Sequence, residues 1–154
     1  MSVKSQENNM RRLANLLSKD LGYIWGERES GPNGTKKTFL NLGKVFLRTL
    51  SKDLGLRDTK VQSNPSGIAV SGDCSLIGMW EHNGIYISLS QFCGGKYVLL
   101  YRMARHIRDY SSSHNHFLTL DDLRKLSYTD LLEKFTALRK EGGSHGRRNN
   151  SWAA

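Results

Sequence analysis

The stretch LSKDLG at residues 50–55 marks the point where the apolar pattern of this 154-residue chain changes from helical to alternating. Before it, apolar residues recur three or four positions apart and therefore line one face of a helix: Phe39, Leu42, Phe46, Leu50 and Leu54. Gly55 lies where a helix usually ends, because glycine adopts the left-handed conformation without a Cβ penalty. With Gly55 at position C′, Leu56 is C″ and Leu50 is within reach for the hydrophobic contact that accompanies such a helix end.

The same hexapeptide occurs at residues 17–22, after a shorter apolar stripe that includes Leu13 and Leu17. It predicts a first helix that ends at Gly22, followed by a glycine-rich loop over residues 26–37 and a second helix capped by Thr38. A helical repeat array needs at least about three copies to bury a continuous core, and the sequence holds no third copy. The hexapeptide is therefore interpreted as one helix end written twice.

After Gly55 the sequence predicts five short strands separated by turn signals, over residues 59–63, 67–71, 74–80, 84–90 and 97–105. Asn83-Gly84 suits a tight type I′ hairpin in which both residues have positive φ. Such close spacing favours an antiparallel meander over crossover units. Ile85, Ile87 and Leu89 alternate with Tyr86, Ser88 and Ser90, so one face is expected to pack on helices and the other to be at least partly wet.

The C-terminal third predicts a polar loop over residues 106–117 and then two helices. Thr119 with Asp122, and Ser127 with Asp130, fit S/T-x-x-D capping patterns for helices near 120–126 and 128–140. Gly142 and Gly143 are expected to end the second of them. The prediction is an α+β protein with two N-terminal helices, a meander of about five strands and one or two C-terminal helices, forming one domain over residues 1–141 with a flexible basic tail at 142–154.

Charge is unevenly placed along the chain, which carries 23 Lys and Arg, 14 Asp and Glu and a net charge of +9. Residues 1–60 hold 12 basic and 6 acidic residues (+6), residues 61–100 hold 1 and 2 (−1), and residues 101–154 hold 10 and 6 (+4). Basic flanks around a neutral middle favour polyanionic partners or acidic protein surfaces, with an ordinary soluble surface as the alternative.

No apolar run approaches the roughly 18 to 20 residues that span a bilayer, and residues 1–12 lack the apolar segment of a secretory signal. We therefore expect a cytoplasmic protein without a membrane partner. Cys74 and Cys93 show no CxxC spacing and are expected to be buried free thiols. No cofactor is implied.

A set of five sequence motifs resembles a group of uncharacterised small proteins, also found as domains of large polyvalent proteins, that phages and plasmids encode. The motifs are a KDLG helix end at 52–55, GIAVSG at 67–72, an aromatic strand ending in SQ at 85–91, a VLYR-like strand at 99–102 and a DY segment at 109–115. The resemblance covers about half of the chain, roughly residues 40–117. It implies a mobile-element origin and a core of two helices and a meander, and it implies no reaction. SSSHNH stands where the group has a Gly-Gly-x-Asn-type turn, so no site residue is carried over from it.

The densest group of reactive side chains is the set His106, Asp109, His114 and His116. His114 and His116, with Asp109, could hold a divalent metal. Alternatively, His106 and His114 could act as a general acid–base pair on a phosphodiester. A solvent-exposed polar loop with no chemistry is the alternative interpretation. The tripeptide H-N-H at 114–116 is not the HNH nuclease motif, whose three residues lie far apart in sequence.

Basic residues form the candidate set for binding a partner or nucleic acid. Lys44 and Arg48 lie four apart on the polar side of the second predicted helix, and Arg105 and Arg108 could form an anion-binding surface. Ordinary ion pairing or a merely solvated face is the alternative for each. The whole set is Lys36, Lys37, Lys44, Arg48, Arg105, Arg108, Arg147, Arg148 and Trp152.

These observations favour a non-enzymatic binder of phage or plasmid origin that acts on a host nucleic-acid machine, for example as an anti-CRISPR protein. A direct DNA- or RNA-binding protein is the alternative, resting on charge alone. A small nuclease that uses the histidine loop is a third, weaker hypothesis.

Overall fold

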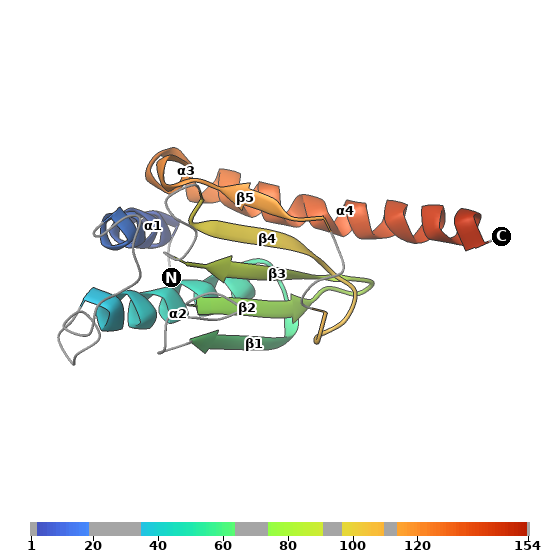
Figure 1. Cartoon of the computed structure of the whole chain (residues 1–154), viewed down its shortest axis with the longest axis horizontal. Coiled ribbons are helices and arrows are strands. Elements are labelled where there is room, and N and C mark those ends of the chain that lie inside the picture. Colours follow the sequence, from blue (N-terminus) through green and yellow to red (C-terminus); the bar gives the residue numbers. More distant parts are fainter. Residues whose placement is uncertain (1–2, 19–34, 64–73, 91–96, 110–113, 154) are drawn as a thin grey trace.

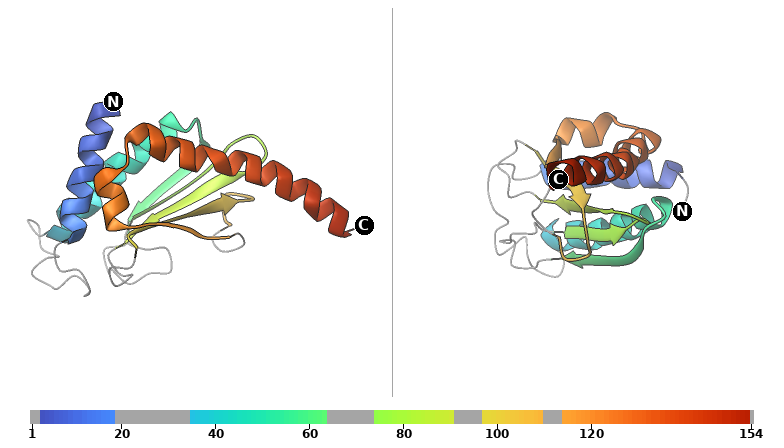
Figure 2. Two further views of the ribbon diagram at one scale, coloured as in Figure 1. Left: turned by 90° about the horizontal axis from the view of Figure 1, so that it is seen from above. Right: turned by 90° about the vertical axis from the view of Figure 1, so that its right-hand side faces the viewer.

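The structure is a computed structural model that describes residues 3–18, 35–63, 74–90, 97–109 and 114–153, with side chains throughout except at 35–36 and 142–153. Within these residues a five-stranded antiparallel sheet in the order β1-β2-β3-β4-β5 packs against helices on one side (Figures 1 and 2). The α+β prediction is thus confirmed, with helices before and after a meander.

The strands are β1 Arg57–Ser63, β2 Cys74–Met79, β3 Gly84–Leu89, β4 Leu99–Ala104 and β5 His116–Leu118. The helices are α1 Val3–Ser18, α2 Thr35–Asp53, α3 Leu120–Lys125 and α4 Tyr128–Ala153. The C-terminal half of α4 extends beyond the sheet (Figure 2, left).

The end of α2 is a complete Schellman motif at the second LSKDLG. Gly55 has φ +69°, its N–H donates to the Lys52 carbonyl at 3.0 Å, and the Leu56 N–H donates to the Ser51 carbonyl at 3.0 Å. Leu50 is buried in the core and Leu56 packs against it, so the expected helix end is confirmed there. The matching end at Gly22 lies outside the described residues.

The beginning of α2 differs from the prediction, because the helix starts at Thr35 and Thr38 lies inside it. Lysine is a good helix former and threonine costs no more than about 0.7 kcal/mol relative to alanine, so the TKKT segment can form a first turn ahead of the first apolar residue, Phe39. The Thr38 cap is therefore wrong.

The core lies between the sheet and the helices. Ile85, Ile87 and Leu89 of β3 face it, as predicted, together with Phe46 and Leu50 of α2 and with residues of α1 and α4. The opposite face is also buried along β3, where Tyr86 is 3% exposed and Ser88 9%. The expectation of a wet face is wrong at these positions.

The β2–β3 turn forms without the predicted backbone. Neither Asn83 nor Gly84 has a positive φ, so the type I′ prediction is wrong, and the Trp80 N–H donates to the Asn83 carbonyl at 2.7 Å across a loop of Glu81 and His82. Asn83 Nδ2 instead donates to the Leu138 carbonyl of α4 at 2.8 Å. Gly84 is required by space, because a Cβ there would meet the carbonyl oxygen of Gly78 on the neighbouring strand.

Both C-terminal caps are confirmed. Thr119 and Asp122 form a reciprocal capping box at α3, and the Asp130 N–H donates to Ser127 Oγ at 3.0 Å at the start of α4. The prediction that Gly142 and Gly143 end this helix is wrong, since α4 continues to Ala153. A glycine in a helix interior costs about 1 kcal/mol relative to alanine, which does not by itself stop a helix.

The sequence analysis missed strand β5, and one predicted strand, at 67–71, cannot be compared with the structure. β5 begins within the predicted loop 106–117 and extends one residue beyond it. It pairs with β4, and the Val98 N–H donates to the Leu118 carbonyl at 3.0 Å. The predicted strand 67–71 lies outside the described residues. Cys74 is a buried free thiol, as expected, and Cys93 lies outside them.

Candidate functional site: a cationic helix face and its surroundings

The histidine loop divides into two groups with different partners. Asp109 is 5% exposed, and its Oδ2 accepts hydrogen bonds from the backbone N–H of Arg105 at 2.8 Å and from Arg105 Nε at 3.4 Å. The Asp109 N–H donates to the His106 carbonyl at 3.0 Å, and His106 Nδ1 accepts from the Arg108 N–H at 3.2 Å. Asp109, Arg105 and His106 thus close the turn that follows β4.

His116 lies on β5 beneath α4. Its ring stacks on Tyr101 with centroids 5.0 Å apart, and the His114 ring lies 5.6 Å away. His116 Nε2 is 3.4 Å from Glu141 Oε2, but the geometry is not that of a hydrogen bond, so we read the contact as an ion pair when the imidazole is protonated. Burial raises the pKa of the Tyr101 hydroxyl, and the carboxylates of Glu141 and Asp122 raise it further.

Several residues predicted to bind a metal or to act as acid and base therefore form structural contacts instead. The rings of His114 and His116 lie together, whereas the Asp109 carboxylate is paired with Arg105. Among the residues that the structure describes, no group of three or more His, Cys, Asp or Glu side chains could hold a metal ion.

The predicted basic set occupies three separate parts of the fold. Lys37 and Arg48 are exposed and Lys44 is half-buried on α2, while Arg105 and Arg108 lie on the turn after β4. Arg147, Arg148 and Trp152 belong to the last part of α4, and their side chains, like that of Lys36, lie outside the described residues.

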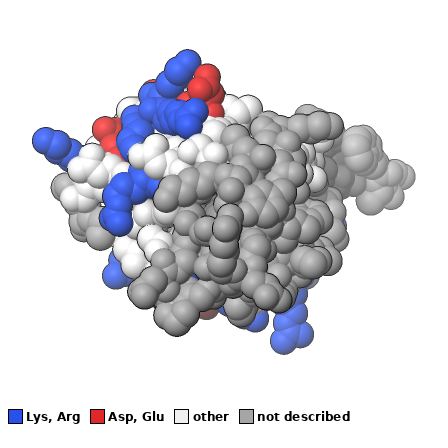
Figure 3. Space-filling view, turned by 60° about the vertical axis from the view of Figure 1, so that its left-hand side comes forward, with Lys and Arg blue, Asp and Glu red and all other residues white. Residues whose placement is uncertain are grey.

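Basic side chains do not form one continuous patch on the face drawn in Figure 3. They lie at several separate places, and the largest group has carboxylates beside it. Among the described ion pairs, Lys125 Nζ lies 3.1 Å from Asp121 Oδ2 on α3. Arg11 of α1 is also engaged, since its Nη1 donates to the Leu123 carbonyl at 2.8 Å and so satisfies the end of α3.

The clearest exception is the α2 stripe, which we define as Lys37, Lys44, Arg48 and Lys52. At 100° per residue these four side chains lie within about 80° of one another on the helix surface, opposite the buried Phe39 and Phe46. They span about 22 Å at 1.5 Å per residue. None forms an ion pair with a carboxylate that the structure describes. Lys52 was missed because it belongs to the helix-stop motif.

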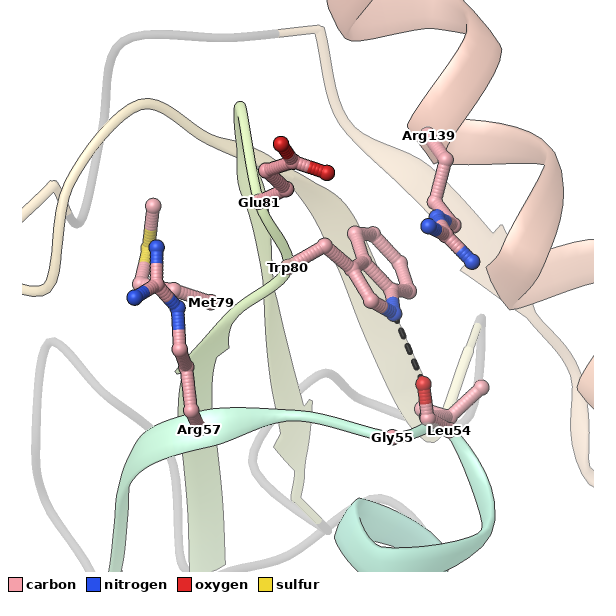
Figure 4. Close-up of a pocket in the computed structure, with 7 residues that line it drawn as sticks. All are labelled: Leu54, Gly55, Arg57, Met79, Trp80, Glu81 and Arg139. Atoms are coloured by element: carbon pink, nitrogen blue, oxygen red, sulfur yellow. Dashed lines mark hydrogen bonds between the residues drawn. The ribbon is translucent and has the colours of Figure 1, made fainter.

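A shallow recess of about 360 Å³ lies just past the end of the α2 stripe (Figure 4). Trp80 forms one wall, and its Nε1 donates to the Leu54 carbonyl at 2.7 Å, which fastens the β2–β3 turn to the end of α2. The Arg139 guanidinium of α4 lies 5.7 Å from the centroid of the Trp80 ring. Arg57 and Glu81 stand at the rim (Figure 4). The recess thus adds two cations and one anion to the end of a cationic helix face.

No protein-family model matches this chain, and no curated protein or solved structure matches it significantly. None of the described helices is both long enough and apolar enough to cross a membrane. Because one fold serves many functions, the function has to be argued from the α2 stripe and its surroundings.

Proposed function

We propose that this protein is a mobile-element accessory protein that acts as a non-enzymatic binder and inhibits or modulates a host nucleic-acid machine, such as a CRISPR effector. The α2 stripe is the observation that carries the proposal. Four cations on one exposed helix face, with no described carboxylate paired to them, attract a phosphate backbone or an acidic protein surface. The phage and plasmid motifs quoted above support the origin.

The positions of the reactive side chains favour a binder over an enzyme. A general base needs a free atom within reach of the substrate, whereas Asp109 accepts two hydrogen bonds from Arg105 and His116 is stacked on Tyr101 beside Glu141. These contacts indicate that the residues of the histidine loop stabilise the edge of the sheet.

The proposal is tested by affinity capture of a tagged chain from host lysate, with and without nuclease treatment. A variant in which all four residues of the α2 stripe are changed to Gln is expected to lose a partner that survives nuclease. The matched control changes four exposed cations elsewhere to Gln, namely Lys4, Arg124, Lys134 and Lys140. Because both variants lose the same net charge, equal losses would contradict a specific role for the stripe.

Direct binding to DNA or RNA is the second candidate, since the same four cations fit a phosphate backbone. Fluorescence anisotropy with random-sequence duplex DNA and single-stranded RNA measures it. For duplex DNA, log affinity should fall with log salt with a slope of about −0.9 per phosphate neutralised, so the stripe variant should lose about 3 to 4 in slope. Weak binding that both variants share would instead favour a protein partner.

A further inference from the structure

The sheet face away from the helices holds a second, smaller apolar cluster with one charged residue in it. Ile77, Tyr86 and Ala104 form the cluster, and Leu100 and Ile107 pack against it. Arg102 of β4 lies opposite Tyr86 in the strand register and is only 4% exposed.

The Arg102 guanidinium is held on two of its sides. Its centre lies 4.3 Å from the centroid of the Tyr86 ring, which is a cation–π contact, and Nη1 donates to Asn115 Oδ1 at 3.5 Å. Nε and Nη2 are both buried and have no hydrogen-bond partner among the described residues. These two nitrogens share one edge of the planar group, with their N–H bonds nearly parallel. We call them the fork edge of Arg102.

Buried guanidinium nitrogens without an acceptor are unusual in a protein interior, because leaving a buried charged donor unpaired is strongly unfavourable. Burial lowers the pKa of the Arg102 guanidinium, while Tyr86 and the Asp109 carboxylate raise it. Arginine nevertheless stays protonated in proteins, so the charge has to be balanced in another way. The Asp109 carboxylate is the anion that raises this pKa, and its Oδ2 already accepts hydrogen bonds from Arg105.

We propose that the fork edge of Arg102 binds a small free oxyanion of the phosphate class. Two parallel N–H donors match two oxygens of such an anion, and this bidentate geometry distinguishes arginine from lysine. Neither nitrogen is exposed to solvent, so a nucleic-acid strand or a helix cannot reach them, and a small ion reaches them when the side chains that cover them move aside. The site is separate from the α2 stripe, which lies on the other side of the sheet.

Calorimetric titration of the whole chain with inorganic phosphate, in chloride buffer of constant ionic strength, tests the proposal. We expect saturable binding to the wild type that Arg102→Gln weakens by about tenfold or more, and that Arg102→Lys weakens less because it keeps the charge and loses the fork. Arg108→Gln is the matched control, since Arg108 is an exposed cation six residues away, and it should bind phosphate as the wild type does. Equal binding by wild type and Arg102→Gln would overturn the proposal.

A measurement on the unmutated chain covers the case in which the Arg102 variants do not fold. The arginine Nε–H resonances are followed by NMR during the same phosphate titration. One buried, slowly exchanging Nε–H should shift with the calorimetric binding curve. Absence of any shift at millimolar phosphate would overturn the proposal.

Discussion

The two faces of the sheet are both buried at β3, but they are built from different residues. The helix-covered face presents Ile85, Ile87 and Leu89 to α2 and α4, and buried polar side chains beside it form hydrogen bonds. Gln6, for example, donates to the Phe46 carbonyl and to the Tyr128 hydroxyl, both at 3.2 Å. This face has the composition of an ordinary protein core.

The opposite face carries serines on β2 and β3, the Tyr86 ring and the incompletely bonded Arg102. Such residues contribute less to stability per unit of buried area than aliphatic side chains do. The difference is that the helix-covered face holds the main apolar core, while the opposite face holds a smaller apolar cluster around an incompletely bonded charge. Removal of a core ring and removal of that charge should therefore have opposite effects on stability.

The largest effect is expected on the helix-covered face. Phe46 is fully buried and meets Tyr128 edge to face at 6.4 Å, so Phe46→Ala should lower the free energy of unfolding by about 3 to 5 kcal/mol. Urea unfolding followed by circular dichroism measures this. Phe117→Ala on β5, where the side chain is 48% exposed, is the control and should cost less than about 1 kcal/mol. Similar losses for both would contradict the assignment of the main core.

A smaller effect, dependent on pH, is expected at Tyr128, where the helices meet. Its hydroxyl donates to Asp53 Oδ2 at 2.6 Å and accepts from Gln6, and Tyr128→Phe should cost about 1 to 2 kcal/mol near neutral pH. Burial, followed by the hydrogen bond to Asp53, raises the pKa of this phenol. The folded state therefore disfavours its ionised form, so the stabilisation is fully present below the unfolded pKa of about 10 and is lost as pH rises above it.

Unfolding measured from pH 7 to pH 11 for wild type and Tyr128→Phe isolates this group from the lysines, which titrate in both proteins. The wild-type advantage should be constant up to about pH 9 and then shrink. A constant difference over the whole range would show that the phenol is not ionised on unfolding, contrary to the prediction.

The smallest effect, of opposite sign, is expected at Arg102. Arg102→Met keeps most of the side-chain volume and removes a buried, incompletely bonded charge. In phosphate-free buffer it should leave the free energy of unfolding unchanged or raise it by about 1 kcal/mol. A loss above about 2 kcal/mol would show that the guanidinium is a structural partner within the folded chain, and would make the two faces alike.

The local sequence was sufficient to predict features whose stabilising contacts all lie within one short segment. The Schellman motif at Gly55, the capping box of Thr119 with Asp122 and the alternation of β3 were all predicted correctly, since each depends on neighbours within a few residues. Local patterns gave wrong predictions where contacts with a distant segment determine the conformation. Gly84 was assigned a turn conformation, although its role is to let β3 approach Gly78.

The candidate sites depended far more on tertiary structure. The spacing of Lys44 and Arg48 was enough to place both on one helix face, and that prediction is confirmed. The engagement of Asp109 by Arg105, and the stacking of His116 on Tyr101, could not be read from spacing, because they require β4, β5 and α4 to be in place. The sequence shows Arg102 as a basic residue of the strand LLYRMA, close to Arg105 and Arg108, but it shows neither the burial of Arg102 nor its contacts.

The sequence by itself determined the class of fold, the order of helices and strands around a meander, and the excess of positive charge at both ends of the chain. Periodicity and capping depend on residues close together in the chain, so they can be recognised without knowing which elements pack against each other. Only the tertiary structure decided which charges are paired and which are not. Pairing depends on distances between segments far apart in the chain, and that is why the α2 stripe and the fork edge of Arg102 became visible only in the folded protein.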